Sequence, residues 1–577
     1  MKAHRMALAG GLAVSMAAIV AGCGISTAAS HNAALKPVRG GTIVVALPPQ
    51  TNLTWYFPLS NSSNNTLYNG QLNAAMYLPL LYTNNKYNIQ YQNSVADKVT
   101  YNPAGTVFHV FLNKKWHWSD GKPVTSADVL WTWKIIQAIS AKNAPAPWPY
   151  TGAGTGDIPQ GVKSVQANGP YEFTVTLKQP ANQQWFIYNG LGQLQPLPMQ
   201  AWNKYPTNLH KEIVYLGKEA TNPHFDTVVD GPYKLASAVS SQSWKLVPNT
   251  KYSGPHALST IILAYQGSNS SEFAALKTGA VQVGYVNLSE YGARGELKGV
   301  DKLWAGYNFG YQFLSLNLNS KAQGGMGPIF QQLYVRQALE MAIPQPAIDN
   351  SIYHGFAPPQ YGPIPSKPST SFLDPALQKP TYPYNLAKAK KLLTSNGWKE
   401  SGGVMTKNGQ KLAFTIMYSS GDQATTDEMA LIQSDFARIG VTVTLDPQPF
   451  ASMVGIITNP ADEGKWAAVS GIGITYGGSY PSGEEVFKNG GGLDFFGYND
   501  PTENALITKT TQPAANAQAN LKTFFKFESY TAQQLPVLFI NNPGTIEAVA
   551  TNVHGVNQST LNPVTGYPLW QYWWVGK

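Results

Sequence analysis

Hydrophobic and polar positions follow a clear pattern between Thr106 and Trp133. Over Thr106–Leu112, β-branched and aromatic residues in rough alternation predict a strand. Ser119–Lys122 then favours a turn, because Asp can bond its own backbone and Gly tolerates positive φ. Thr125 stands where it can cap a helix, with Asp128 three residues later near the positive end of the helix dipole. The apolar residues of that helix share one face, which must be buried: Val129, Trp133 and Ile136.

Strand and helix patterns continue along the rest of the chain. Residues 39–48 read as a buried strand that ends at a proline, and residues 162–177 alternate around Asn168-Gly169, which predicts a hairpin with a two-residue turn. The period changes from helix to strand across Gly279, and residues 432–445 again read as a helix that feeds a strand. No short internal repeat is present, which argues against solenoids and propellers.

The N-terminus has the pattern of an export signal. Lys2 and Arg5 precede an uncharged run that is too short to span a bilayer comfortably. The run ends at Val20–Cys23, which resembles a bacterial lipobox, the site at which a cysteine is acylated after cleavage. Cys23 is the only cysteine of the 577 residues, so no intramolecular disulfide can form.

We therefore expect residues 1–22 to be a lipoprotein signal peptide and residues 23–35 a flexible tether. Two acyl chains on Cys23 would hold the protein firmly on the outer face of the cell membrane, at the cell surface or in the periplasm. The alternative is an ordinary secretory signal with an incidental cysteine.

Composition limits the remaining choices. The formal net charge of +9 falls to +7 when Lys2 and Arg5 leave with the signal. Spread over roughly 550 residues without a basic run, this charge does not favour nucleic acid, and a chain of this length needs two or three domains. Only 12% of the residues are charged, about half the usual share. A surface solvated by neutral polar groups depends little on carboxylate ionisation, so we hypothesise that the protein suits acidic or salty surroundings.

The segment Trp116–Trp133 resembles the "W-S-D-G-K-P-V-T-A-x-D-V" signature of family-five extracellular solute-binding proteins. These proteins are the oligopeptide-, dipeptide- and nickel-binding receptors of ABC importers. Asp230–Leu235 resembles the family's "G-x-G-P-Y-x-L", and Leu333–Ile343 resembles "D-x-R-V-R-Q-A-L-x-Y-A-I". Further matches occur in family order from about residue 39 to residue 550.

This resemblance implies an α/β fold of two lobes that close on a ligand like a clamshell, with an extra inserted domain. We expect residues 36–75, 205–310 and 546–577 to form lobe I, residues 76–204 the inserted domain, and residues 311–545 lobe II. Two crossings between the lobes would act as a hinge.

The implied function is that of a monomeric receptor, not an enzyme, that captures a small extracellular ligand and delivers it to ABC permease subunits, with no cofactor and no metal. Oligopeptides are the default ligand. The alternative is a neutral oligosaccharide.

The resemblance also places candidate ligand contacts. Tyr285 and Asn287 fall where peptide receptors place a Tyr and neighbouring main chain on the ligand. Tyr476, Gly477 and Ser479 lie in a segment that resembles "W-x-A-D-Y-P-D".

Two tryptophans are weaker candidates, Trp55 and Trp148. Trp55 begins a run of three adjacent aromatics in a loop, and we expect at least one of the three to face a cleft.

This sequence departs from the family motif at the position that binds the amine of the ligand. In peptide receptors the Asp of "A-D-Y" accepts the peptide α-ammonium, but here that position is Ser479, and the second acidic position is Ser482. Either Glu484 or Glu485 supplies the counter-charge, or the ligand has no free amine at this place. We hypothesise the latter, a neutral or blocked ligand that is held by aromatic stacking and by amide and hydroxyl bonds.

A remote alternative is an enzyme that acts on β-lactams. Ser119–Lys122 satisfies S-x-x-K and Lys277–Gly279 satisfies K-T-G. No S-x-N lies between them, and Ser119 stands in a turn before a proline instead of at a helix N-terminus. Motifs of zinc hydrolases, α/β-hydrolases and P-loop ATPases are absent, so neither metal-dependent hydrolysis nor ATP hydrolysis has a basis in the sequence.

Overall fold

The computed structural model describes residues 36–225 and 228–576, so Cys23 and the predicted signal peptide and tether lie outside the described residues. Within the described ranges, no helix is both long enough and apolar enough to cross a bilayer.

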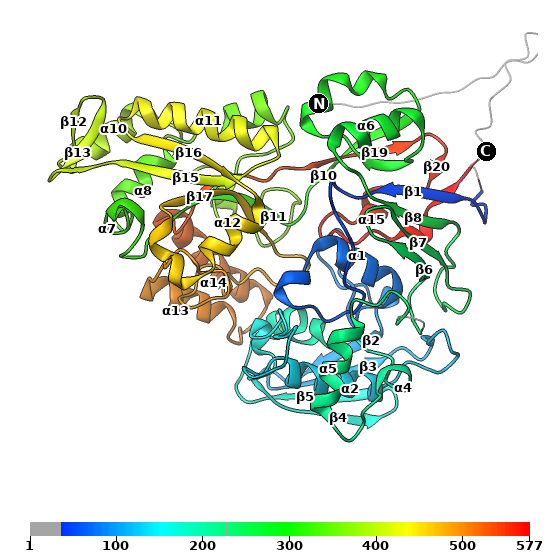
Figure 1. The fold of residues 1–577 in the computed structure, drawn as a ribbon. Helices are drawn as coiled ribbons and strands as arrows, with labels where there is room; N and C mark the ends of the chain where they lie inside the picture. Colours follow the sequence, from blue (N-terminus) through cyan, green and yellow to red (C-terminus); the bar gives the residue numbers. More distant parts are fainter. Residues whose placement is uncertain (1–35, 226–227, 577) are drawn as a thin grey trace, which may run out of the picture. The chain divides into compact units, whose positions relative to one another are not determined.

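The first sheet has seven strands in the order β10-β19-β9-β1-β8-β7-β6 (Figure 1). β1 pairs in parallel with β8 and β9, whereas β19 runs antiparallel to β9 and β10. Phe273 and Leu276 of α6 pack on one face of the sheet, and the other face joins a larger core that contains Leu72 of α1. We call this domain lobe I. Its elements are β1 (Thr42–Ala46), α1 (Leu67–Met76), β6 (Tyr233–Val239), β7 (Ser243–Pro248), β8 (Thr260–Ala264), α6 (Asn269–Thr278), β9 (Val283–Tyr285), η6 (Leu288–Glu296), β10 (Val300–Gly306) and β19 (Thr545–Ala550).

The second sheet has five strands in the order β16-β15-β17-β11-β18, and we call its domain lobe II (Figure 1). β15 runs parallel to β16 and β17, and α11 connects β15 to β16. The main elements are β11 (Gly310–Leu316), α8 (Leu333–Glu340), α10 (Leu386–Ser395), β15 (Ala413–Ser419), α11 (Gln423–Arg438), β16 (Thr442–Gln448), α12 (Phe450–Ile457), β17 (Ala468–Thr475), α13 (Pro501–Thr510), α14 (Ala517–Gln534) and β18 (Leu538–Asn541).

The chain passes between the two sheets at two short connections. β10 ends at Gly306 and β11 begins at Gly310, while β18 ends at Asn541 and β19 begins at Thr545. Connections of this kind can absorb the backbone rotation of a hinge while each lobe keeps its packing.

A third sheet, in the order β2-β3-β5-β4, lies in the part of the chain between α1 and α5. We refer to residues 76–204 as the insert. Its elements and the helix that follows are β2 (Ala96–Tyr101), β3 (Val107–Leu112), α2 (Ser126–Ile139), β4 (Val162–Gly169), β5 (Glu172–Leu177), α3 (Gln183–Trp185), η4 (Phe186–Gly190) and α5 (Leu209–Glu219).

The strand, turn and helix predicted around residue 120 are confirmed. Thr125 caps α2, and its backbone N–H donates to Asp128 Oδ2 at 2.8 Å, which completes a capping box. The predicted buried face of α2 is in the core, with Val129 and Ile136 at 0% exposure and Trp133 at 7%.

The hairpin turn is displaced from its predicted place. β4 continues through Asn168 and Gly169, and the turn falls on Pro170 and Tyr171 instead. Gly169 pairs with Glu172, so the cross-strand register sets the position of this turn, and the Asn-Gly dipeptide does not.

Candidate functional site

The lobe I candidates lie at the end of β9 and just beyond it. The Tyr285 backbone N–H donates to Glu272 Oε1 at 2.8 Å, and its half-buried ring extends to the Ala46 carbonyl, 3.4 Å from the hydroxyl. Burial raises the Tyr285 pKa well above its ordinary value, so the hydroxyl stays protonated. Asn287 caps η6 by accepting from the Ser289 backbone N–H at 2.9 Å.

A row of three side chains crosses lobe I at this point. Glu547 on β19 lies opposite Tyr285 on β9 and opposite Trp304 on β10, so the three share one face of the sheet. All three are half-buried. Burial raises the Glu547 pKa to about 7, and the nearby Glu547 charge helps to raise the pKa of Tyr68 on α1. Of the three residues in this row, the sequence predicts only Tyr285, because no local pattern links residues 285, 304 and 547.

The lobe II candidates form a turn after β17. The Tyr476 backbone N–H donates to the Phe309 carbonyl at 2.8 Å, and the Ser479 N–H closes the turn on the Tyr476 carbonyl at 2.7 Å. Gly477 has a φ of +55°, and a Cβ added there would meet nothing within 4 Å. The Tyr476 hydroxyl donates to the Pro363 carbonyl at 2.7 Å.

An aromatic cluster joins this turn to the insert. Tyr87 of the insert lies 4.6 Å from Phe309 and 5.5 Å from Phe372, measured between ring centroids. The cluster as a whole comprises Tyr87, Tyr188, Phe309, Phe372, Tyr476, Tyr480 and Phe524.

Side chains of the insert also form hydrogen bonds with the main chain of the turn. The Tyr87 hydroxyl donates to the Ser479 carbonyl. Asn189 accepts from the Tyr480 N–H at 2.6 Å and donates to the Tyr480 carbonyl at 3.2 Å. The insert is therefore docked on the lobe II segment at which we expected ligand.

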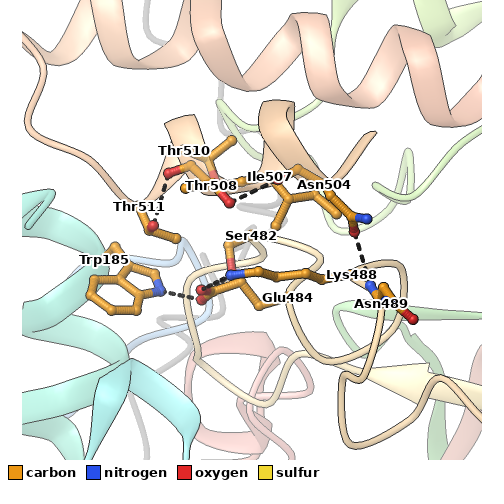
Figure 2. Close-up of polar contacts among 10 residues, drawn as sticks. All are labelled: Trp185, Ser482, Glu484, Lys488, Asn489, Asn504, Ile507, Thr508, Thr510 and Thr511. Atoms are coloured by element: carbon orange, nitrogen blue, oxygen red, sulfur yellow. Dashed lines mark hydrogen bonds and ion pairs between the residues drawn. The ribbon is translucent and has the colours of Figure 1, made fainter. Parts of the chain in front are cut away.

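Glu484 and Glu485, the carboxylates that could replace the missing acidic residue, both have partners. Trp185 of the insert donates from Nε1 to Glu484 at 2.7 Å, and the Ser482 hydroxyl donates to the same carboxylate at 3.1 Å (Figure 2). Lys488 Nζ lies 4.0 Å from Glu484. Burial raises the Glu484 pKa although Lys488 opposes the rise. The Thr155 hydroxyl of the insert donates to Glu485 at 2.6 Å.

Neighbouring contacts hold this region in place. Figure 2 shows the Trp185 indole directed at the Glu484 carboxylate, and Asn489 of the same loop tied to Asn504 of α13 by a 2.9 Å hydrogen bond. Asn182, which is 2% exposed, donates from Nδ2 to the Thr510 carbonyl at 2.7 Å and to Asn520 Oδ1 at 2.8 Å.

The two tryptophan candidates, Trp55 and Trp148, are both buried. Trp55 is 1% exposed and Trp148 is 6% exposed, and their rings meet edge to face with centroids 5.9 Å apart. Their indole N–H groups donate to the Leu59 and Ile213 carbonyls, both at 3.1 Å. Tyr56 and Phe57 are buried as well, because side chains of the insert and of α5 cover the loop and share one hydrophobic core with it.

Trp55 also lines a cavity of about 170 Å³ beside α1. This volume is smaller than the several hundred Å³ of usual ligand pockets. Two buried polar atoms of its lining, Asn73 Oδ1 and Trp570 Nε1, have no hydrogen-bond partner in the part of the chain that is described. A cavity of this size and polarity fits ordered water better than an extended ligand.

In the described part of the chain, Ser119 and Lys277, which the β-lactam alternative requires, contact other groups. Ser119 Oγ accepts from the Val229 backbone N–H at 3.2 Å, and Lys277 forms a 2.6 Å ion pair with Glu296 on the surface of lobe I. Over residues 36–225 and 228–576, no group of three or more His, Cys, Asp or Glu side chains is placed to hold a metal ion.

Comparison with known proteins identifies relatives over nearly the whole chain. The family model for bacterial extracellular solute-binding proteins, family 5, matches residues 90–492. The oligopeptide-binding protein AppA of Bacillus subtilis is 23% identical over 558 residues, which are 96% of this chain and 95% of the relative.

Solved structures agree in fold. The structure of Bacillus subtilis AppA in complex with a nonapeptide covers 94% of this chain and 100% of its own, with a TM-score of 0.74 and 21% identity. NikZ from Campylobacter jejuni in complex with Ni(L-His) covers 92% and 99%, with a TM-score of 0.73 and 19% identity. These matches confirm the expected two-lobed α/β fold, and their different ligands show that the fold alone does not determine the ligand.

Proposed function

Because the chain belongs to the bacterial extracellular solute-binding proteins of family 5, we propose that it captures oligopeptides outside the cytoplasm and delivers them to the permease of an ABC importer. The observation that carries this proposal is the placement of Tyr285 and the Tyr476–Ser479 turn on two lobes between which the chain passes at the short connections 307–309 and 542–544. A ligand held between such lobes contacts both, so binding and closure are coupled.

The proposal includes the anchor and the partners. Acylation of Cys23 would keep the receptor beside its permease on the outer face of the membrane. In this proposal the receptor acts as a monomer. It needs no catalytic residues of its own, since ATP hydrolysis belongs to a separate subunit of the importer.

Native mass spectrometry of protein purified without refolding tests the ligand class. Retained species with masses that differ by amino-acid residues support the proposal. A series that differs by hexose units would replace it with the oligosaccharide receptor. A β-lactam hydrolysis assay on the same protein should give no product.

A further inference from the structure

Among the described residues, the lobe II segment 476–485 offers the amine of a peptide no carboxylate without a hydrogen-bond partner. Ser479 and Ser482 are neutral, Glu484 accepts from Trp185 and Ser482, and Glu485 accepts from Thr155. An ammonium group that loses water without gaining a counter-charge is strongly unfavourable. A peptide with a free amine therefore needs an anionic group elsewhere in the protein.

Lobe I has a carboxylate with the required properties. Glu547 is half-buried, and among the described residues it forms no hydrogen bond or ion pair through its side chain. It differs in this respect from Glu272 behind the sheet, which is 1% exposed and accepts the Tyr285 N–H. Glu547 also lies close to the hinge, three residues beyond the connection at 542–544.

Aromatic rings flank this carboxylate. Tyr285 lies directly opposite on β9, and Tyr68 of α1 packs against the core on the same face of the sheet, where the Glu547 charge helps to raise its pKa. Both hydroxyls stay protonated because burial raises their pKa values, so each ring presents a neutral π face. A carboxylate beside neutral aromatic rings is suited to an alkylammonium ion, which gains a charge-assisted hydrogen bond and cation–π contacts together.

We propose that Glu547, with Tyr285 and Tyr68, forms the subsite that binds an alkylammonium group of the ligand. The inference rests on the proposed peptide function, and the group can be the peptide α-amine or a lysine side chain. Glu547 then replaces, from lobe I, the acidic residue that lobe II lacks at Ser479, and it selects ligands by charge.

Competition between peptide pools tests the subsite. Purified protein is incubated with an equimolar mixture of two random hexapeptide pools without Lys, Arg or His, one with free N-termini and one N-acetylated. Captured peptides are counted by mass spectrometry. The wild-type protein should enrich the free pool tenfold or more, which corresponds to about 1.4 kcal/mol.

Substitutions test whether Glu547 causes the preference for peptides with a free amine. Glu547→Gln should bring the ratio of free to acetylated peptides within twofold of unity, while Glu547→Asp, which keeps the charge, should retain a preference. Glu485→Gln is the matched control and should behave as the wild type. A second arm with N-acetylated peptides that carry one Lys distinguishes the side-chain amine from the α-amine.

The outcomes separate the two proposals. Capture of neither pool by the wild type would overturn the peptide function and the subsite with it. Capture of both pools without preference in both arms, or an unchanged preference in Glu547→Gln, would overturn the subsite and leave the peptide function standing.

Discussion

Glu428 on α11 gives a direct test of how this protein holds its buried carboxylates. Its side chain is fully buried, and Oε2 accepts from Asn541 Nδ2 at 2.7 Å. The hydrogen bonds of Asn541 and Tyr353 to this carboxyl favour its ionised form, but the effect of burial is larger. Burial raises the Glu428 pKa from 4.5 to about 7.

The sign of the pH effect follows from proton binding. In the unfolded chain the carboxyl loses its proton near pH 4.5, and in the folded protein it does so near pH 7. Between these values the folded state binds more protons, so stability falls as the pH rises and then levels off. Below pH 4.5 both states are protonated and the group has no effect. At about 1.4 kcal/mol per pKa unit, the loss is roughly 3 kcal/mol.

Glu428→Gln removes this ionisation and keeps the shape of the side chain. We expect the variant to match the wild type at pH 4.5 and to be more stable by roughly 2 to 3 kcal/mol at pH 7.5. Urea unfolding followed by tryptophan fluorescence measures both values. Equal dependence of stability on pH in the two proteins would refute the reasoning.

Glu400→Gln is the control for this experiment. Glu400 is exposed and pairs with Lys390 on the surface at 2.7 Å, so its replacement should change stability by less than about 1 kcal/mol at either pH.

The same arrangement recurs in other buried acids. In the described residues, none of them forms an ion pair with Lys or Arg, and burial raises the pKa of each: Asp230, Glu272, Glu340, Glu503 and Glu528. Ionisation of each of these acids lowers the stability of the folded protein as the pH rises, so we expect the wild-type protein to be most stable at acidic pH. This agrees with the hypothesis drawn from the small share of charged residues.

Three further predictions concern the anchor, the docked insert and the core. Cys23→Ser should release the protein into the soluble fraction without a change in circular dichroism, and a variant that stays tightly on the membrane would contradict the lipid anchor. Asn182→Ala leaves the Thr510 carbonyl and Asn520 without a donor, at a cost of about 1 to 3 kcal/mol to the docked state. The radius of gyration from small-angle scattering should therefore rise in the ligand-free variant and fall on saturation with peptide, and an unchanged curve in both conditions would mean one rigid body. Trp148→Ala removes the ring that packs on Trp55 and should lower the free energy of unfolding by about 3 to 5 kcal/mol, whereas a loss below about 1 kcal/mol would place Trp148 outside the core.

The sequence was sufficient wherever a structure depends on neighbouring residues. The turn at 119–122 and the Thr125 cap with Asp128 follow from hydrogen bonds within one short segment, and both are present. The helix end at Gly279 is likewise local, since its φ of +75° suits glycine. The order of motifs along the chain was also sufficient for the family and the two-lobed fold.

Burial of the loop aromatics could not be predicted from the loop itself. Trp55 contacts Trp148, which is 93 positions later in the sequence, and the core that receives it is built by the insert. The packing of an aromatic ring depends on what covers it, and this information lies in distant segments.

The candidate site shows the same division. The sequence offers Glu484 as a possible counter-charge for the ligand amine. Its hydrogen-bond donor Trp185 lies 299 residues away in the sequence, and only the docking of the insert on lobe II brings the two together. Glu547, in contrast, has no motif around it. It becomes a candidate because the pairing of β9, β10 and β19 places residues 285, 304 and 547 in one row. Local sequence determines which segments form strands and caps, whereas long-range pairing decides which polar groups remain free, because a hydrogen bond is satisfied by whichever group the fold brings within about 3 Å.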